Sequence, residues 1–169
     1  MYIRVLNETD TQAYRTIRLN ALLNNPEAFG SSFDEEAAFD LSRFSHRLSN
    51  PKSLTFGAFK GEDLGGICNI SFQPRQKMKH RAEIFSMYVE PPNRGKGVGR
   101  MLIEHVLQAA RRRTQVQQVY LTVVSSNQTA KALYTSFGFE TYGVDQRAMF
   151  YNNRFYDHDL MVLYLKDRC

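Results

Sequence analysis

Glycines and basic residues alternate in one short segment, which reads Arg94-Gly95-Lys96-Gly97-Val98-Gly99-Arg100. A β-forming stretch precedes this segment and an amphipathic, helix-forming stretch follows it, so the glycines are expected at the start of a helix. The first backbone N–H groups of a helix lack partners within the helix and carry positive potential. Glycines let an anion approach the backbone closely. The segment therefore predicts a seat for a phosphate or a pyrophosphate.

The glycine spacing separates this segment from two other phosphate-binding motifs. A Walker P-loop requires GxxxxGK[ST], and that string does not occur in the sequence. The dinucleotide motif GxGxxG also fits poorly, because Gly99 is followed directly by Arg100 and the turn lies in the middle of the chain. The remaining alternative is a glycine-rich turn that binds no ligand.

A second group of residues with potential chemistry follows, and it reads Asn127-x-x-Ala130-x-x-Leu133-Tyr134-x-x-x-Gly138-Phe139. Asn127 and Tyr134 are seven positions apart, or two helical turns, so they would share one face of a helix. The amide of Asn127 could hydrogen-bond a ligand, and the hydroxyl of Tyr134 could donate a proton. The alternative is that Tyr134 only packs with Leu133 and Phe137 under the sheet.

Taken together, the two groups resemble the acyl-CoA-binding motif of the GNAT N-acetyltransferase family. The resemblance extends over nearly the whole chain, with its signature portion at residues 83–139. It implies an N-acetyltransferase that moves an acetyl group from acetyl-CoA to a primary amine, by direct attack with both substrates bound together. Acetyl-CoA would be the cosubstrate. No metal is implied, because no His, Cys and Asp cluster has the spacing of metal ligands.

The resemblance also assigns residues to the cosubstrate. Residues 94–100 would hold the pyrophosphate, and residues 87–89 would offer main-chain N–H and C=O groups to the thioester arm. The strand that contains residues 87–89 is expected to part from the strand at residues 119–124. The expected contacts are Met87, Tyr88, Val89, Arg94, Gly95, Lys96, Gly97, Val98, Gly99, Arg100, Asn127, Ala130 and Tyr134.

Two residues are expected to move protons. Amine attack on a thioester expels a thiolate, and Tyr134 is placed by the resemblance to protonate it. Glu83 opens the central strand, and in several branches of the family a glutamate near this place deprotonates the amine. Burial beside Ile84 and Phe85 would suit that role. The alternatives for Glu83 are a salt bridge with Arg81 or Lys79, and His80 and His158 are rival bases.

The acceptor side is defined less sharply. By resemblance, the candidate substrate contacts are Phe29, Phe33, Tyr156 and His158. Many relatives have Tyr-x-Asp-Glu near residue 156, and His158 departs from that pattern. The acidic cluster of residues 34–36 could attract a cationic amine, but acidic residues in a first helical turn more often complement the helix dipole. A polyamine, an amino acid, an antibiotic, an aromatic amine or a protein N-terminus all fit.

Periodicity predicts an α/β domain with one mixed sheet. The family resemblance implies a GNAT-like α/β (α+β) fold, as a single domain over residues 1–169. Its sheet would be mostly antiparallel, with about seven strands flanked by about four helices. Thr9 with Gln12 and Ser32 with Glu35 have the spacing of capping boxes. The second helix is expected to run from Ser32 past Phe39 towards residue 48. Strands are expected at residues 2–6, 53–59, 64–72, 82–89, 116–124, 140–151 and 155–165, and the other helices near residues 9–24, 97–113 and 127–137.

Composition sets the cellular context. The 169 residues carry a net charge of +5, which suits a polyanionic partner but is equally explained by solubility. Cys68 lies in an apolar stretch and reads as a core residue, while Cys169 ends the chain, so no disulfide framework is expected. No secretory h-region and no membrane-spanning run occurs, which predicts a cytoplasmic protein without a membrane partner. Exposed strand edges make a homodimer possible.

Two further classes of function are weighed against the acetyltransferase. One is a non-catalytic sensor that binds CoA or acyl-CoA, which would share the phosphate seat and would not use Tyr134 and Glu83. The other is a nucleic-acid binder, suggested by the basic run at residues 111–113. That run ends a helix, where cations oppose the negative end of the dipole, and no recognition motif accompanies it, so no nucleic-acid partner is expected.

Overall fold

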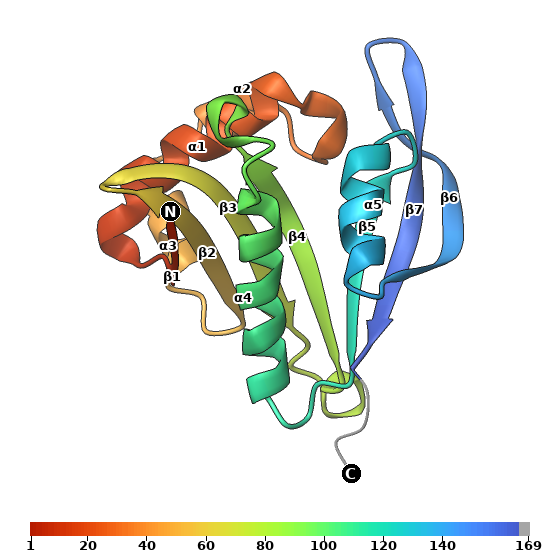
Figure 1. Cartoon of the computed structure of the whole chain (residues 1–169). Helices are drawn as coiled ribbons and strands as arrows, with labels where there is room; N and C mark the ends of the chain where they lie inside the picture. The colour runs from red at the N-terminus through yellow and green to blue at the C-terminus, as the bar shows by residue number, and fades with distance from the viewer. Residues whose placement is uncertain (166–169) are drawn as a thin grey trace.

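A seven-stranded sheet runs through the molecule in the order β1-β2-β3-β4-β5-β7-β6 (Figure 1). The computed structural model describes residues 1–165. Only β4 and β5 pair in parallel, and all other neighbouring strands are antiparallel. The strands are β1 (Tyr2–Val5), β2 (Ser53–Lys60), β3 (Asp63–Phe72), β4 (Arg81–Val89), β5 (Gln118–Val124), β6 (Glu140–Tyr151) and β7 (Arg154–Tyr164). The mixed, mostly antiparallel sheet is confirmed.

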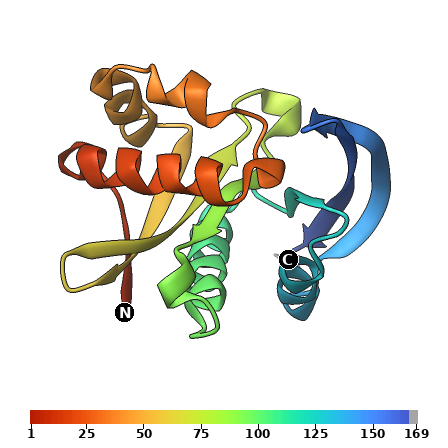
Figure 2. The same cartoon turned by 90° about the horizontal axis from the view of Figure 1, so that it is seen from above.

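Helices cover both faces of the sheet, as the view from above shows (Figure 2). One face carries α1 (Thr11–Asn24), α2 (Phe33–Ala37) and α3 (Leu41–Leu48), and the other carries α4 (Val98–Arg112) and α5 (Gln128–Ser136). Five α-helices therefore flank the sheet within residues 1–165, rather than about four. None of the helices in this part of the chain is long and apolar enough to cross a membrane.

Each face of the sheet has its own hydrophobic core. Strand residues alternate between the two cores, as β3 shows: Ile67 packs under α1, while Cys68 and Ile70 pack under α4. Cys68 is fully buried, and burial raises the pKa of its thiol, so it is an inert core residue as predicted. Cys169 lies outside the described residues.

The prediction of one continuous second helix is wrong. The segment forms two helices, α2 and α3, because Asp40 adopts an extended backbone with φ −62° and ψ 151° at the start of α3. The capping box at the start of α2 is confirmed: Glu35 N donates to Ser32 Oγ over 3.2 Å, and Ser32 N donates to Glu35 Oε2 over 2.7 Å.

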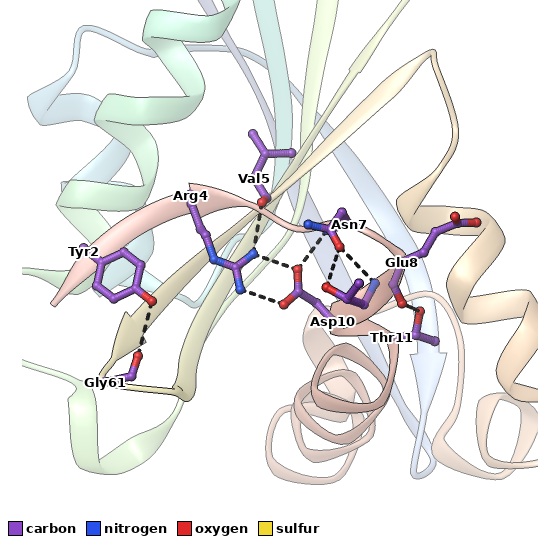
Figure 3. Close-up of polar contacts among 9 residues, drawn as sticks. Tyr2, Arg4, Val5, Asn7, Glu8, Asp10, Thr11 and Gly61 are labelled. Carbon is purple, nitrogen blue, oxygen red and sulfur yellow. Dashed lines mark hydrogen bonds and ion pairs between the residues drawn. The ribbon is translucent and has the colours of Figure 1, made fainter.

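The capping box predicted for Thr9 and Gln12 is also wrong. Asn7 is the N-cap, and it caps a short 3₁₀ turn, η1 (Glu8–Asp10), that leads into α1. The side chain of Asn7 accepts from Thr9 N, while Asp10 Oδ2 accepts from Asn7 N over 2.9 Å (Figure 3). Asp10 is held in place by two 2.7 Å hydrogen bonds from Arg4, so β1 and the start of α1 are joined directly.

Candidate active site

A β-bulge interrupts β4 at Ser86. On β3, Ile67 and Asn69 are two positions apart, but they pair with Tyr88 and Phe85, which are three positions apart, so β4 carries one extra residue. Ser86 adopts a left-handed conformation with φ 52°, which a residue other than glycine rarely does. The bulge reverses the side-chain alternation, because Ile84 belongs to the core under α4 whereas Tyr88 belongs to the core under α1.

The sheet opens between β4 and β5 immediately before this bulge. The two strands pair from Arg81 with Gln118 to Ile84 with Leu121, and the pairing ends there. β5 continues alongside β7 as far as the pair Val124 and His158. Figure 1 shows the two strands diverging from their common end. The predicted parting of the strands is confirmed, and it leaves residues 85–89 without a strand partner on the β5 side.

The glycine-rich turn and the start of α4 line a cavity of about 570 Å³ on one side of this gap. Gly97 is the N-cap of α4 with φ 77°, and Gly95 has φ 71°. A Cβ atom at either position would meet no atom within 4 Å, so open space lies beside both glycines. At Gly99 a Cβ would stand 3.2 Å from Met87 Cε and 3.3 Å from Leu133 Cδ2. The turn is thus a concave backbone surface that fits a phosphate group.

Basic side chains surround the turn but are tied to neighbouring groups. Arg94 Nε donates to Val89 O over 2.8 Å, and Arg94 Nη2 donates to Asn25 Oδ1 over 2.9 Å. Arg100 Nη2 donates to Ser136 Oγ over 2.9 Å. Both arginines line the cavity, whereas Lys96 bonds Pro92 O and lies outside its walls. The carbonyl of Val89, expected to be offered to a ligand, is therefore engaged by Arg94.

A second cavity of about 360 Å³ lies in the gap itself, because residues of both parting strands line it. It is bounded by β4, β5, the loop before α2, the start of α5 and His158 of β7. The two cavities share wall residues at the gap, which are Ala28, Phe29, Met87, Asn127 and Ala130. A molecule lying in the first cavity would therefore meet a molecule in the second where β4 and β5 part.

The helix α5 places Asn127 in the shared wall and Tyr134 in the wall of the second cavity. Asn127 is the N-cap of α5, and its Oδ1 accepts from Ala130 N over 3.1 Å, so its amide NH₂ group is the part left for a ligand. Tyr134 is 6% exposed and packs edge-on against Phe139, yet it also lines the second cavity. Burial, together with the nearby Cys68, raises the pKa of the Tyr134 hydroxyl above its usual value, so the hydroxyl stays protonated at neutral pH.

Glu83 lies on the same cavity wall, but its environment differs from the expectation. The residue is exposed rather than buried beside Ile84 and Phe85, so the prediction that burial prepares it as a base is wrong. The alternative also fails, since within residues 1–165 neither Arg81 nor Lys79 forms an ion pair with it. The guanidinium of Arg81 instead stacks 3.9 Å from the ring centroid of Tyr120. Glu83 thus presents a free carboxylate to the cavity.

The four predicted acceptor contacts divide into two pairs. Phe29 and His158 line the second cavity, and the buried Nε2 atom of His158 has no hydrogen-bond partner among the described residues. Phe33 packs against the core under α1, and Tyr156 pairs with Met149 in the β6–β7 hairpin, so both lie outside the cavity walls.

Two wall residues of the second cavity, Arg18 and Ser86, were not predicted. Arg18 Nε and Nη2 donate to the two carboxylate oxygens of Glu36 over 3.1 and 2.7 Å, and Arg18 Nη1 donates to Ser86 Oγ over 3.2 Å. Arg47 Nη1 also donates to Glu36, over 2.8 Å. Glu36, expected to complement a helix dipole, is instead the fully buried centre of an ion-pair cluster. The available signal was a charged residue, Arg18, within the apolar stripe of the first helix.

The Glu36 cluster makes stability depend on pH. Burial alone would raise the pKa of the Glu36 carboxyl, but the hydrogen bonds from Arg18 and Arg47 outweigh burial and lower the pKa from 4.5 to about 2. A lowered pKa stabilises the folded state above pH 4.5, and that contribution is lost as the pH falls towards 2. Above pH 4.5 the lowered pKa of Glu36 contributes about 3 kcal/mol to the free energy of unfolding.

We therefore expect the free energy of unfolding of the wild type to fall more steeply than that of Glu36→Gln as the pH drops from about 4.5 to about 2.5. Urea unfolding at a series of pH values measures this difference. Glu62→Gln, at an exposed carboxylate in the β2–β3 turn, is the control and should parallel the wild type. A constant gap between wild type and Glu36→Gln across this range would contradict the assignment.

The sheet order, the gap between β4 and β5, and the glycine turn at the start of α4 together define a class of protein. The family model described as "Acetyltransferase (GNAT) domain" matches residues 3–160, which is nearly the whole chain. The protein belongs to the GNAT acetyltransferase family. The resemblance seen in the sequence is thereby confirmed.

Particular relatives are similar over part or all of the chain. The N-alpha-acetyltransferase RimI of Mycobacterium tuberculosis is 35% identical over 104 residues, which are 62% of this chain and 63% of that protein. The chain covers less than two thirds of the length of the curated relatives it matches. The covered share is 31% of one of them and 63% of the RimI protein. Among solved structures, the ribosomal-protein-alanine N-acetyltransferase from Brucella melitensis superimposes with a TM-score of 0.85 at 27% identity, covering 98% of this chain and 100% of that chain. The yncA protein of Salmonella typhimurium, solved with its cofactor acetyl-CoA, has a TM-score of 0.80 at 22% identity, covering 100% and 96% of the two chains.

Proposed function

We propose that the protein transfers an acetyl group from acetyl-CoA to a primary amine while both substrates are bound. One observation carries this proposal: the cavity at the glycine turn and the cavity in the sheet opening share walls at Met87, Asn127 and Ala130. The cavity at the glycine turn suits the phosphates of acetyl-CoA, and the cavity beside Glu83 suits the acceptor. The names of the relatives, which include N-alpha-acetyltransferase RimI, support an amine acceptor.

The proposed reaction is a single displacement at the thioester carbonyl. The amine nitrogen attacks the carbonyl carbon, a C–N bond forms and the C–S bond breaks. The acetyl group is then bound to the amine, and coenzyme A departs as a thiolate that takes up a proton to become the thiol. Main-chain groups of residues 85–89, which lack a strand partner on the β5 side, are the donors proposed for the carbonyl oxygen. No covalent enzyme intermediate is needed, and within the described residues the only free cysteine, Cys68, is fully buried.

The two protons of this reaction are assigned to Glu83 and Tyr134. Glu83 takes the proton that the amine must lose, directly or through water, because its exposed carboxylate lies on the wall of the acceptor cavity. Tyr134 gives its hydroxyl proton to the departing thiolate. The hydroxyl is protonated at neutral pH, as a proton donor must be, because burial raises its pKa.

The alternative of a non-catalytic sensor needs only the first cavity. A protein that merely binds acyl-CoA has no use for a second cavity that opens at the thioester end, nor for a carboxylate and a tyrosine in its walls. The arrangement of both cavities around one gap therefore favours the enzyme.

The proposal is tested by mixing the protein with acetyl-CoA and a panel of primary amines and following the release of free thiol. Thiol should appear only when protein, acetyl-CoA and a suitable amine are all present. Glu83→Gln should lower kcat by roughly 10-fold or more with acetyl-CoA affinity unchanged, while Glu62→Gln should match the wild type. Tight acetyl-CoA binding without thiol release on any amine would establish the sensor instead.

A further inference from the structure

A buried guanidinium forms part of the wall of the acceptor cavity. Arg18 comes from the middle of α1, is 6% exposed, and lines the cavity together with Phe29, Glu83 and Ser86. We propose that Arg18 binds an anionic oxygen group of the acceptor, so that the acceptor is a small amine of the α-amino acid type. This inference rests on the proposed acetyl transfer and names its acceptor class.

Arg18 has hydrogen-bonding capacity left for a ligand. A guanidinium carries five N–H donors. Nε and Nη2 each donate one hydrogen bond to Glu36, and Nη1 donates one to Ser86 Oγ. One N–H on each terminal nitrogen has no partner among the described residues. Both N–H groups lie in the plane of the guanidinium and can donate to the oxygens of a carboxylate or of a related oxyacid.

The charges around Arg18 also leave room for an anion. Glu36 is the single carboxylate that bonds both Arg18 and Arg47, so the cluster holds two positive charges against one negative charge. Arg47 is one-third exposed and can be balanced by solvent, whereas the Arg18 side chain is 7% exposed and lines the cavity. The other titratable side chains in the cavity walls are Glu83, His158 and Tyr134. Glu83 supplies the opposite sign, which suits the ammonium end of a zwitterion.

The position of Arg18 limits how far apart the two ends of the acceptor can be. Its Nη1 bonds Ser86, and the next residue, Met87, belongs to the junction of the two cavities. An anionic group on Arg18 therefore lies close to the place where the amine must meet the thioester. An amine on the carbon next to a carboxylate satisfies both requirements, whereas a long spacer between the two groups does not.

The remaining walls favour an apolar side chain on that acceptor. Phe29, whose ring centroid is 4.8 Å from the Arg18 guanidinium carbon, faces the cavity with Phe85 and Leu121. The cavity volume of about 360 Å³ is at the lower end of the range for small-molecule sites. A peptide N-terminus has an uncharged amide in place of the carboxylate and would leave the two remaining N–H groups of Arg18 without an anionic partner.

The inference is tested on the wild-type protein with matched sets of acceptors. Each set holds one amino acid, its primary amide, its decarboxylated amine and a tripeptide that begins with the same residue, built on alanine, leucine and phenylalanine. With acetyl-CoA saturating, kcat/KM from thiol release should be at least ~10-fold higher for the acid than for the other three in whichever set reacts best. An amide, amine or tripeptide that reacts as well as the acid would overturn the inference and leave the proposed acetyl transfer standing.

Two variants test whether the preference for the acid over the amide comes from Arg18. Arg18→Gln should remove the preference for the acid over the amide, mainly through a higher KM for the acid. Arg47→Gln is the matched control, since Arg47 bonds the same Glu36 carboxylate but lies outside the cavity walls, and it should keep the preference. Acetyl-CoA affinity by calorimetry reports whether each variant is folded. If Arg18→Gln is unfolded, the wild-type acceptor sets still decide the question. Failure of every amine to release thiol would count against the proposed function itself.

Discussion

Tyr134→Phe is expected to lower kcat on the order of 100-fold, with the affinity for acetyl-CoA nearly unchanged. The hydroxyl is the only atom removed, and the phenylalanine ring keeps the edge-on contact with Phe139, whose centroid lies 5.9 Å away. Because burial holds the hydroxyl in its protonated form, the loss of the hydroxyl removes a proton donor rather than a charge. Steady-state kinetics by thiol release measures kcat, and calorimetry with acetyl-CoA measures affinity.

Tyr120→Phe is the matched control for this change. Tyr120 lies on β5, its hydroxyl donates to Gln118 over 2.7 Å, and it is outside the walls of the two cavities that meet at the gap. Its removal should leave kcat near the wild-type value. If Tyr134→Phe and Tyr120→Phe have the same kcat, Tyr134 is a packing residue and another group protonates the thiolate.

Gly97→Val is expected to weaken acetyl-CoA binding by at least ~10-fold. The loss in binding free energy should exceed the loss in the free energy of unfolding. Gly97 has φ 77°, and a Cβ there would point into the open space in which we propose the phosphates lie. Valine would both occupy that space and strain the backbone at the start of α4, where the free N–H groups are. Calorimetry with acetyl-CoA gives the affinity, and urea unfolding gives the stability.

Gly61→Val separates the effect of backbone strain from the effect of filling the proposed phosphate site. Gly61, in the turn between β2 and β3, has φ 62° and also has open space around the Cβ position, but it is not a wall residue of either cavity. The strain of a valine in a left-handed conformation should therefore lower stability to a similar extent in both variants. Acetyl-CoA affinity should fall only in Gly97→Val. An equal affinity in the two variants would mean that the glycine turn does not bind the cosubstrate.

Local sequence patterns predicted the helices and turns that line the proposed acetyl-CoA cavity. The apolar period of α4, the hairpin turn at Gly61 and the glycines before Val98 depend on neighbouring residues only, and their positions were correct within a few residues. The family resemblance correctly predicted that β4 and β5 part. The start of α1 was misplaced because Asn7 and Thr9 can both cap a helix, and Asn7 does so here.

Non-local contacts account for what the sequence did not reveal. The break between α2 and α3 at Asp40 is hidden, because no proline or glycine stands between Phe33 and Leu48 to mark it. Burial of Arg18 depends on Glu36, eighteen positions away, and on Ser86, sixty-eight positions away. The bulge at Ser86 exists only relative to the pairing with β3. Each of these features requires knowledge of which segments meet in space.

The pairing between β4 and β5 is short, so the sheet consists of two parts, β1–β4 and β5–β7, that are joined at one end only. Four residue pairs, from Arg81 with Gln118 to Ile84 with Leu121, are the whole ladder between β1–β4 and β5–β7. A slender ligand lying in the opening would act as a surrogate strand and would supply the missing cross-sheet hydrogen bonds. If acetyl-CoA binds in the opening as we propose, it completes the sheet, and the free energy of unfolding should rise with the concentration of acetyl-CoA.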